Sequence, residues 1–192
     1  MNNFKKICDK QDLLLEYNKE TNIYSLIFTI NNKKNINVKQ LLDDNIFKLL
    51  KTLNPEIIEE VIEIKTYENE NIILFIFKEI GKEAGLKRKF MFLNNIKKFE
   101  NNKLVINTKS VKITELMNNN LLSKEILKKI DNLKEVNCEF ATLNMIPSDN
   151  SNLNIHYIFK ILLNENLQKY LENIIGLLMK KIFLNLKIFI EN

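Results

Sequence analysis

The chain has 192 residues, of which 45% are hydrophobic and 28% are charged. This balance is typical of one globular domain with its own core and excludes a disordered chain. The net charge of +5 comes from lysines spread along the chain, and Arg88 is the single arginine. Nucleic-acid recognition favours clustered arginines among aromatic residues. We therefore expect no nucleic-acid partner, whereas a diffuse lysine surface suits transient contact with an anionic membrane.

The two cysteines and the apolar segments indicate a soluble cytoplasmic protein. Cys8 and Cys138 are too few and too far apart for a disulfide framework or a zinc site. Residues 1–6 lack the apolar centre of a signal peptide. The apolar stretch Ile174–Ile190 is interrupted by three lysines and an asparagine, so it is a poor transmembrane span. We expect reduced thiols, no metal and no cofactor.

The first part of the chain favours a helix, a strand and a second helix. Residues 4–18 have apolar positions consistent with a short helix. The stretch Asn22–Ile30 is rich in Ile, Tyr and Phe and indicates a strand. Apolar residues at helical spacing predict a helix over Val38–Leu53. Asn54-Pro55 ends this helix, because the residue before a proline disfavours the α region.

The second part favours paired strands and a closing helix. The expected pairs are Glu60–Tyr67 with Ile72–Glu79, Leu86–Leu93 with Lys103–Val111, and Cys138–Ile146 with Leu153–Leu163 around the turn Pro147–Asn152. A short helix is expected near Ser123–Ile130, and a long apolar helix from about Leu167 to the end. Sequential antiparallel strands with helices at the ends indicate an α+β fold. The expected plan is helix-grip: a curved antiparallel sheet of about six to eight strands wrapped around a long C-terminal helix, in one domain spanning 1–192.

Several local sequences in this order resemble the StAR-related lipid-transfer (START) family. Its domains carry an Arg-Asp-Phe-type strand, a strand ending in Ser-Val, and then a long loop. Lys87–Phe90, Asn102–Val111 and residues 112–133 follow in that order here. Val38–Asp44 resembles the helix after the family's first strand, and Met145–Pro147 and Tyr157–Ile161 lie where its closing strands should be.

The chain also departs from the family pattern. Lys89 replaces the family's Asp, there is no tryptophan, and the loop after Val111 lacks a His-Pro pattern. The resemblance covers most of residues 20–190. It implies a helix-grip fold that binds a lipid, such as a phospholipid, a sterol or a fatty acyl ligand, and transfers it between membranes without catalysis.

Alternation of side chains across strands gives a first set of candidate ligand-binding residues. Arg88, Phe90 and Phe92 share one face, which we take as the interior. An interior guanidinium needs a carboxylate or an anionic headgroup. Arg88 would therefore anchor the headgroup or pair with an internal acid, and Glu79 is the candidate because it shares its face with Phe75 and Phe77. Alternatively, Arg88 lies at a strand end and reaches solvent.

The closing strand and helix supply the remaining candidates. Tyr157 and Phe159 share a face that would line the cavity, and His156 falls on the outer face. Ile174 and Leu178 belong to the core stripe of the terminal helix, whose apolar surface exceeds what one core face needs. The excess would cover a cavity or meet a membrane or a partner, although ordinary core packing explains the same residues.

No catalytic motif is visible, so we do not expect an enzyme. Gly81–Gly85 lacks the Gly-Lys-Ser/Thr ending of a phosphate loop. The leading hypothesis is lipid binding in an internal apolar cavity closed by the C-terminal helix. One alternative is a structural or protein-interaction component, for example of a virion, with a filled core. Another is a helix-grip enzyme, which would need a polar cavity with a positioned acid or base. The ligand and the oligomeric state stay open.

Overall fold

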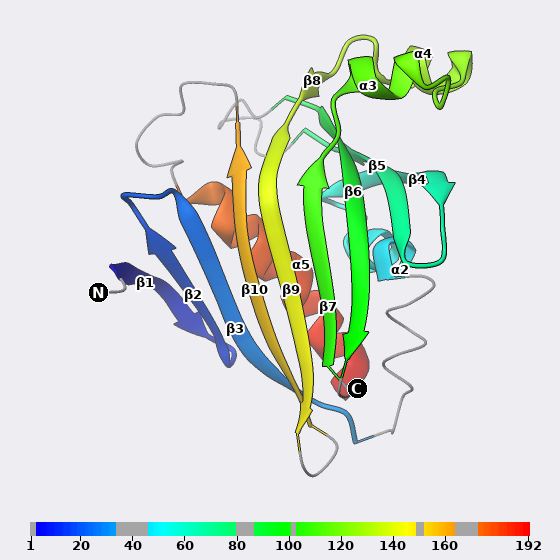
Figure 1. Cartoon of the computed structure of the whole chain (residues 1–192). Helices are drawn as coiled ribbons and strands as arrows, with labels where there is room; N and C mark the ends of the chain where they lie inside the picture. Colours follow the sequence, from blue (N-terminus) through cyan, green and yellow to red (C-terminus); the bar gives the residue numbers. More distant parts are fainter. Residues whose placement is uncertain (1–2, 34–45, 80–86, 101–102, 149–151, 164–172) are drawn as a thin grey trace.

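The computed structural model describes residues 3–33, 46–79, 87–100, 103–148, 152–163 and 173–192. These residues form one ten-stranded sheet and four helices (Figure 1). The strands are β1 (Phe4–Lys10), β2 (Leu13–Asn18), β3 (Ile23–Asn31), β4 (Ile58–Thr66), β5 (Glu70–Phe77), β6 (Lys89–Glu100), β7 (Lys103–Ser110), β8 (Lys134–Glu135), β9 (Asn137–Ser148) and β10 (Asn152–Leu162). The helices are α2 (Ile46–Leu53), α3 (Ile113–Asn118), α4 (Lys124–Ile130) and α5 (Ile174–Glu191).

The sheet pairs the third strand of the chain with the last strand. The strand order is β1-β2-β3-β10-β9-β7-β6-β5-β4, and the short β8 pairs in parallel with β6. All other pairs are antiparallel, and Tyr157 of β10 lies between Leu26 of β3 and Leu143 of β9. The expected α+β helix-grip fold is confirmed. The sheet has more strands than the six to eight expected, because the N-terminal segment adds a hairpin.

Residues 4–18 form this hairpin, so the short helix expected there is wrong. β1 and β2 are antiparallel neighbours joined by Gln11 and Asp12, whose φ angles are 59° and 56°. Positive φ at both turn residues is the geometry of a type I′ turn, which matches the twist of paired strands. Leu13 and Leu15 are fully buried, and they alternate with more accessible neighbours as a strand requires.

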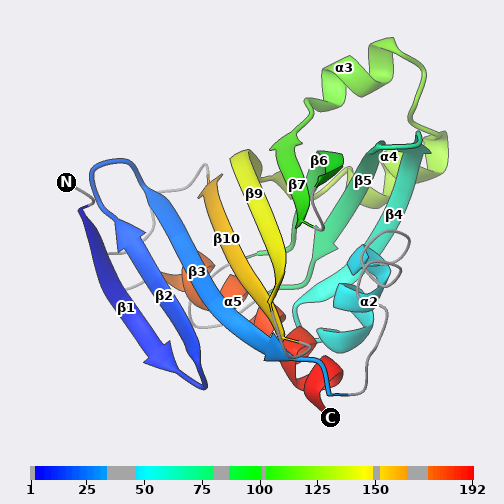
Figure 2. The same ribbon diagram turned by 60° about the horizontal axis from the view of Figure 1, so that its bottom comes forward.

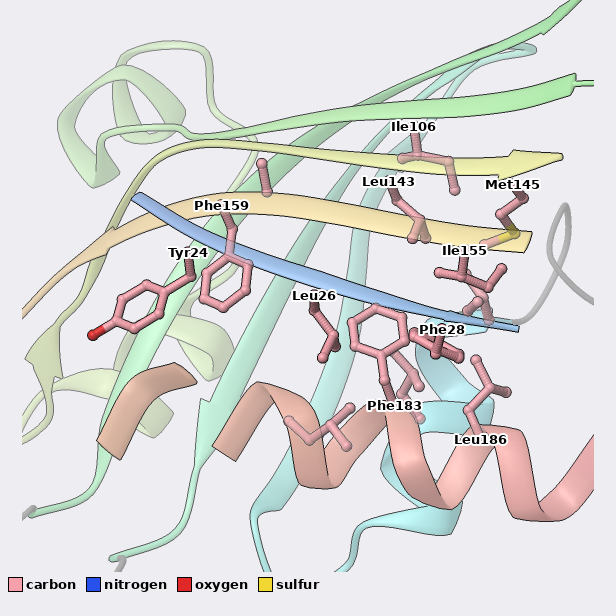
Figure 3. Packing of buried hydrophobic residues seen from close by; sticks show 14 of the residues in the cluster. Tyr24, Leu26, Phe28, Ile106, Leu143, Met145, Ile155, Phe159, Phe183 and Leu186 are labelled. Atoms are coloured by element: carbon pink, nitrogen blue, oxygen red, sulfur yellow. The ribbon is translucent and has the colours of Figure 1, made fainter. Parts of the chain in front are cut away.

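The sheet curves around α5, which runs obliquely across one face (Figures 1 and 2). On that face, Leu26, Leu143 and Phe159 extend toward the helix, and Phe183 and Leu186 extend from the helix toward the sheet (Figure 3). All five side chains are buried. The expected start of this helix near Leu167, the first part of the helix expected over Val38–Leu53 and the loop Gly81–Gly85 lie outside the described residues.

A second, smaller core covers the opposite face of β5 and β6. Leu74, Ile76, Phe90 and Phe92 are buried there against Leu116 of α3 and against other residues from the segment that contains α3 and α4. The sheet is therefore apolar on both faces at β5 and β6. In the described part of the chain, no helix is long and apolar enough to cross a membrane.

Candidate functional site

Two apolar cavities of about 70 Å³ each lie between α5 and the inner face of the sheet. The first is lined by residues from β5, β6, β10 and α5, including Leu178 and the buried Lys89, and has the exposed Lys78 and Lys87 at its margin. The second extends toward α2 and β7 and is lined by Phe47, Phe75 and Leu143 among others. Both cavities are therefore in the space that the sheet encloses around the helix.

Five apolar side chains contribute to the walls of both cavities and separate them: Phe77, Met91, Ile161, Met179 and Ile182. Two of these are methionines, one from β6 and one from α5. Methionine is unbranched and adapts to irregular space more readily than other apolar residues. The two methionines are therefore the most adaptable part of the wall that the two cavities share.

The second cavity has a small number of polar groups in an otherwise apolar wall: Asn95, Thr108, Cys138 and Tyr157. Burial raises the pKa of the Cys138 thiol to about 12, so this thiol stays protonated and unreactive. Burial also raises the pKa of the Tyr157 phenol far above its ordinary value, so this group acts as a neutral hydroxyl. The cavity therefore presents uncharged polar groups.

Several residues selected from the sequence lie at these cavities. Phe75, Phe77, Tyr157 and Leu178 contribute to their walls. Phe159 is fully buried beside them, with its ring stacked between Tyr24 and Tyr157 at centroid distances of 5.2 and 4.8 Å. Ile174 begins α5 and is half-buried, outside the walls of both cavities.

The interior placement of Arg88, Phe90 and Phe92 is wrong. The Arg88 guanidinium is at the surface, where its Nε lies 2.8 Å from Glu59 Oε2 and its Nη2 contacts Oε1 of the same carboxylate. Glu79 is exposed after the end of β5, and the carboxylate that pairs with Arg88 belongs to Glu59 instead. The structure shows the alternative placement, in which Arg88 lies at the end of a strand and its side chain reaches solvent.

Phe90 and Phe92 are buried, but on the outer face against the segment containing α3 and α4. Their neighbours Lys89, Met91 and Leu93 point inward to the cavities instead. The predicted alternation of side chains along β6 was therefore correct, but the wrong face was assigned to the interior. The choice failed because both faces of β6 are covered. Met91 was missed for this reason. Asn95 was missed because the expected strand ended at Leu93, whereas β6 continues to Glu100.

From Lys180 onward, polar side chains attach α5 to the sheet and to α2. The Nζ of buried Lys187 donates to Thr29 O at 2.6 Å, and Glu191 Oε1 accepts from Asn31 N at 2.8 Å. Asn185 Nδ2 donates to Oδ1 of buried Asn54 at 2.8 Å. Lys180 Nζ donates to Lys10 O at 2.9 Å. Residues 174–179 are all apolar and have no side-chain hydrogen bond of this kind.

No protein-family model and no curated protein sequence matches this chain. Its structure is similar to that of human StAR-related lipid transfer protein 5, with a TM-score of 0.76 and 10% identity over 97% of this chain and 86% of the other. The human StarD13 lipid transfer and protein localization domain gives a TM-score of 0.73 and 8% identity over 100% and 90%. A StAR-related lipid transfer protein from Xanthomonas axonopodis gives 0.64 and 12% over 97% and 96%.

The chain has the START fold. At these identities the similarity concerns the fold alone, because one fold can support different functions. The two cavities between α5 and the sheet lie at the centre of the START fold of this chain, and they are its candidate functional site.

Proposed function

We propose that this protein binds a lipid between the sheet and α5 and transfers it between membranes without catalysis. The observation that carries the proposal is the pair of adjoining apolar cavities at the centre of a START fold, separated by adaptable methionine side chains. Burial of apolar ligand surface supplies about 25 cal/mol per Å². In the described part of the chain, neither lining includes a carboxylate or a histidine, which supports binding over acid–base chemistry.

The ligand enters by enlarging the cavities. Each holds about 70 Å³, whereas pockets for small molecules usually hold about 300–1,000 Å³. Movement of Met91 and Met179 joins the two spaces, and an outward shift of residues 174–179 at the start of α5 widens them further. These residues include Leu178 and Met179 of the cavity walls, and none of them carries a polar side chain.

Access to the first cavity lies next to positive charge. Lys78 and Lys87 are exposed at its margin, and Leu177 on the outer side of α5 has 46% of its surface exposed. Lysines near an anionic bilayer contribute about 1 kcal/mol each. We propose that this end of the molecule contacts the membrane during exchange, so that the ligand passes between α5 and the strand ends without crossing water.

The test is native mass spectrometry of the purified protein before and after incubation with vesicles of phosphatidylcholine, phosphatidylserine, cholesterol and dioleoylglycerol, with extraction and identification of bound lipid. The proposal expects about one lipid per chain. Met179→Phe enlarges a side chain in the partition and should reduce uptake severalfold. Ile188→Phe is the matched control, because this side chain of the later part of α5 is 44% exposed and lines neither cavity. Absence of any bound lipid under both conditions contradicts the proposal.

The small size of the cavities favours one other function. A structural or protein-interaction component with a filled core requires no chamber, and cavities of about 70 Å³ are close to that condition. This function predicts a stable oligomer with no lipid in the same spectra. It also predicts that Met179→Phe leaves every measured property except stability unchanged.

A further inference from the structure

The inner face of the sheet carries a row of polar side chains that ordinary core packing does not explain. Asn71 of β5 pairs with Asn95 of β6, which pairs with Thr108 of β7. Residues directly opposite in an antiparallel pair point to the same face. The side chains of Asn95 and Thr108 line the second cavity, and the row continues to Ala141 of β9, opposite Thr108.

Asn95 is fully buried and only half of its amide has a partner. Its Oδ1 accepts a hydrogen bond from Thr108 Oγ1 at 2.8 Å. Its Nδ2 has no hydrogen-bond partner among the described residues, and the same holds for Oδ1 of Asn71 across the strand pair. A buried polar atom without a partner costs about 1–3 kcal/mol. Two such atoms on paired residues of adjacent strands, one of them in the wall of the second cavity, indicate a ligand group that pairs with them.

The chemistry of this row selects the ligand. Asn95 Nδ2 offers a donor and Asn71 Oδ1 offers an acceptor. A hydroxyl can both accept and donate, and it would still pair if the Asn95 amide rotated and exchanged its two atoms. The lysines at the margin of the first cavity do not line the second. An ionised phosphate or carboxylate at Asn95 would therefore be a buried charge without a counter-charge in that lining.

From this arrangement, and resting on the proposed lipid binding, we propose that Asn95 binds the hydroxyl of a neutral lipid. Asn71 and Thr108 complete the site, and the apolar body of the ligand lies along Met91, Met179 and Ile182. The hydroxyl can come from a sterol or from a diacylglycerol. The protein thus selects neutral alcohol lipids over lipids with a charged headgroup.

The experiment compares alcohols with their methyl ethers. The protein is incubated with phosphatidylcholine vesicles that contain cholesterol or cholesterol methyl ether, and in a second arm dioleoylglycerol or its 3-O-methyl ether. Lipid bound per chain is then measured by mass spectrometry. In at least one arm the alcohol should exceed its ether about tenfold, which is the ratio expected for one buried hydrogen bond. The arm that shows the ratio identifies the source of the hydroxyl.

Two variants test the assignment to this side chain. Asn95→Leu should reduce the alcohol-to-ether ratio to about one while lipid is still bound, because leucine keeps the size and removes the amide. Asn107→Leu is the matched control. The Asn107 side chain makes the same kind of cross-strand contact, because its Oδ1 accepts from Thr142 Oγ1 at 3.1 Å. Asn107 precedes Thr108 in β7, so its side chain points to the opposite face of the sheet. The ratio of this control variant should equal that of the unmodified protein.

The outcomes separate this inference from the proposed function. Equal uptake of alcohol and ether, or preferential uptake of phosphatidylcholine, overturns the hydroxyl site and leaves lipid binding intact. Uptake of no lipid at all, phosphatidylcholine included, rejects both. If Asn95→Leu does not fold, the ratio measured on the unmodified protein decides alone.

Discussion

Asn54 links two helices from a fully buried position, and this makes it a sensitive residue. Its Nδ2 donates to Leu50 O at 2.9 Å, and its Oδ1 accepts from Asn185 Nδ2 at 2.8 Å. Asn54→Ala leaves Leu50 O and Asn185 Nδ2 without these partners. We expect the free energy of unfolding to fall by about 2–3 kcal/mol, as measured by urea denaturation.

Asn119→Ala is the matched control for this prediction. Asn119 Nδ2 also donates to the carbonyl four residues earlier, Glu115 O at 3.0 Å, but the side chain is exposed at the end of α3. Exposed groups exchange one hydrogen bond for another with water, so the loss should stay below about 1 kcal/mol. Equal losses in the two variants would show that burial of Asn54 contributes nothing.

His156 makes the stability depend on pH. Its Nε2 lies 3.1 Å from Ser25 Oγ, and burial lowers the pKa of the imidazole from 6.5, partly opposed by Glu16. The folded state therefore binds a proton less readily than the unfolded state. The contribution of the neutral imidazole to the free energy of unfolding is therefore fully present above a pH of about 6.5, and it decreases as the pH drops through that value. His156→Gln should lose less stability than the unmodified protein between pH of about 7.5 and about 5.5, in parallel denaturation series.

At the scale of residues, the alternation of side chains along a strand could be predicted from the sequence. Which of the two faces points toward α5 could not. Phe75, Phe77, Tyr157 and Leu178 were correctly placed at the interior. Arg88, Phe90 and Phe92 were assigned to the wrong side, because β6 buries apolar residues on both faces. Periodicity alone cannot rank two covered faces. Asn95 needed the register of β5, β6 and β7, which no single strand reveals.

At the scale of elements, Gly176 allows α5 to approach the sheet closely. A Cβ at this position would lie 2.7 Å from Cδ1 and Cε1 of Tyr24. The Tyr24 ring is 4% exposed and held between Tyr17 and Phe159, so it cannot move aside easily. Overpacking at position 176 would lower the free energy of unfolding by about 1–3 kcal/mol. The higher helix propensity of alanine would offset about 1 kcal/mol of this loss.

Gly176→Ala should therefore destabilise the protein by up to about 2 kcal/mol, measured as a shift in the urea midpoint at constant slope. The control is Leu177→Ala in the same turn, where 46% of the side chain is exposed and a change within about 0.5 kcal/mol is expected. A stabilised Gly176→Ala variant would mean that Tyr24 moves freely and that contact between α5 and the sheet is loose.

The N-terminal hairpin shows where prediction of elements fails. Paired strands from residue 58 onward and the closing hairpin were expected and are observed. Residues 4–18 were expected to be helical, because their apolar positions suit either period and the turn at Gln11 and Asp12 contains no glycine. Pairing of β2 with β3 decides the conformation, and this contact is invisible in the local sequence.

Across the whole molecule, the attachments of α5 are unequal along its length. Polar contacts from Lys180, Asn185, Lys187 and Glu191 connect its later turns to the hairpins and α2. Its first turns contact the sheet and the cavities through apolar side chains alone. Local opening begins where the fewest interactions must break. The first turns of α5, residues 174–179, should therefore open more often than the turns that follow.

Hydrogen exchange measures this difference directly. Without lipid, the amides of Leu178 and Met179 should exchange at least tenfold faster than those of Leu184 and Leu186, because the latter open only when the buried Lys187 contact with Thr29 O breaks. Lys187→Met keeps the apolar stem and removes this contact, so it should narrow the difference. Lipid uptake should slow exchange at Leu178 and Met179 in particular, since these side chains would then contact the ligand. Uniform exchange along α5 would contradict access through its first turns and would place the opening at another part of the fold.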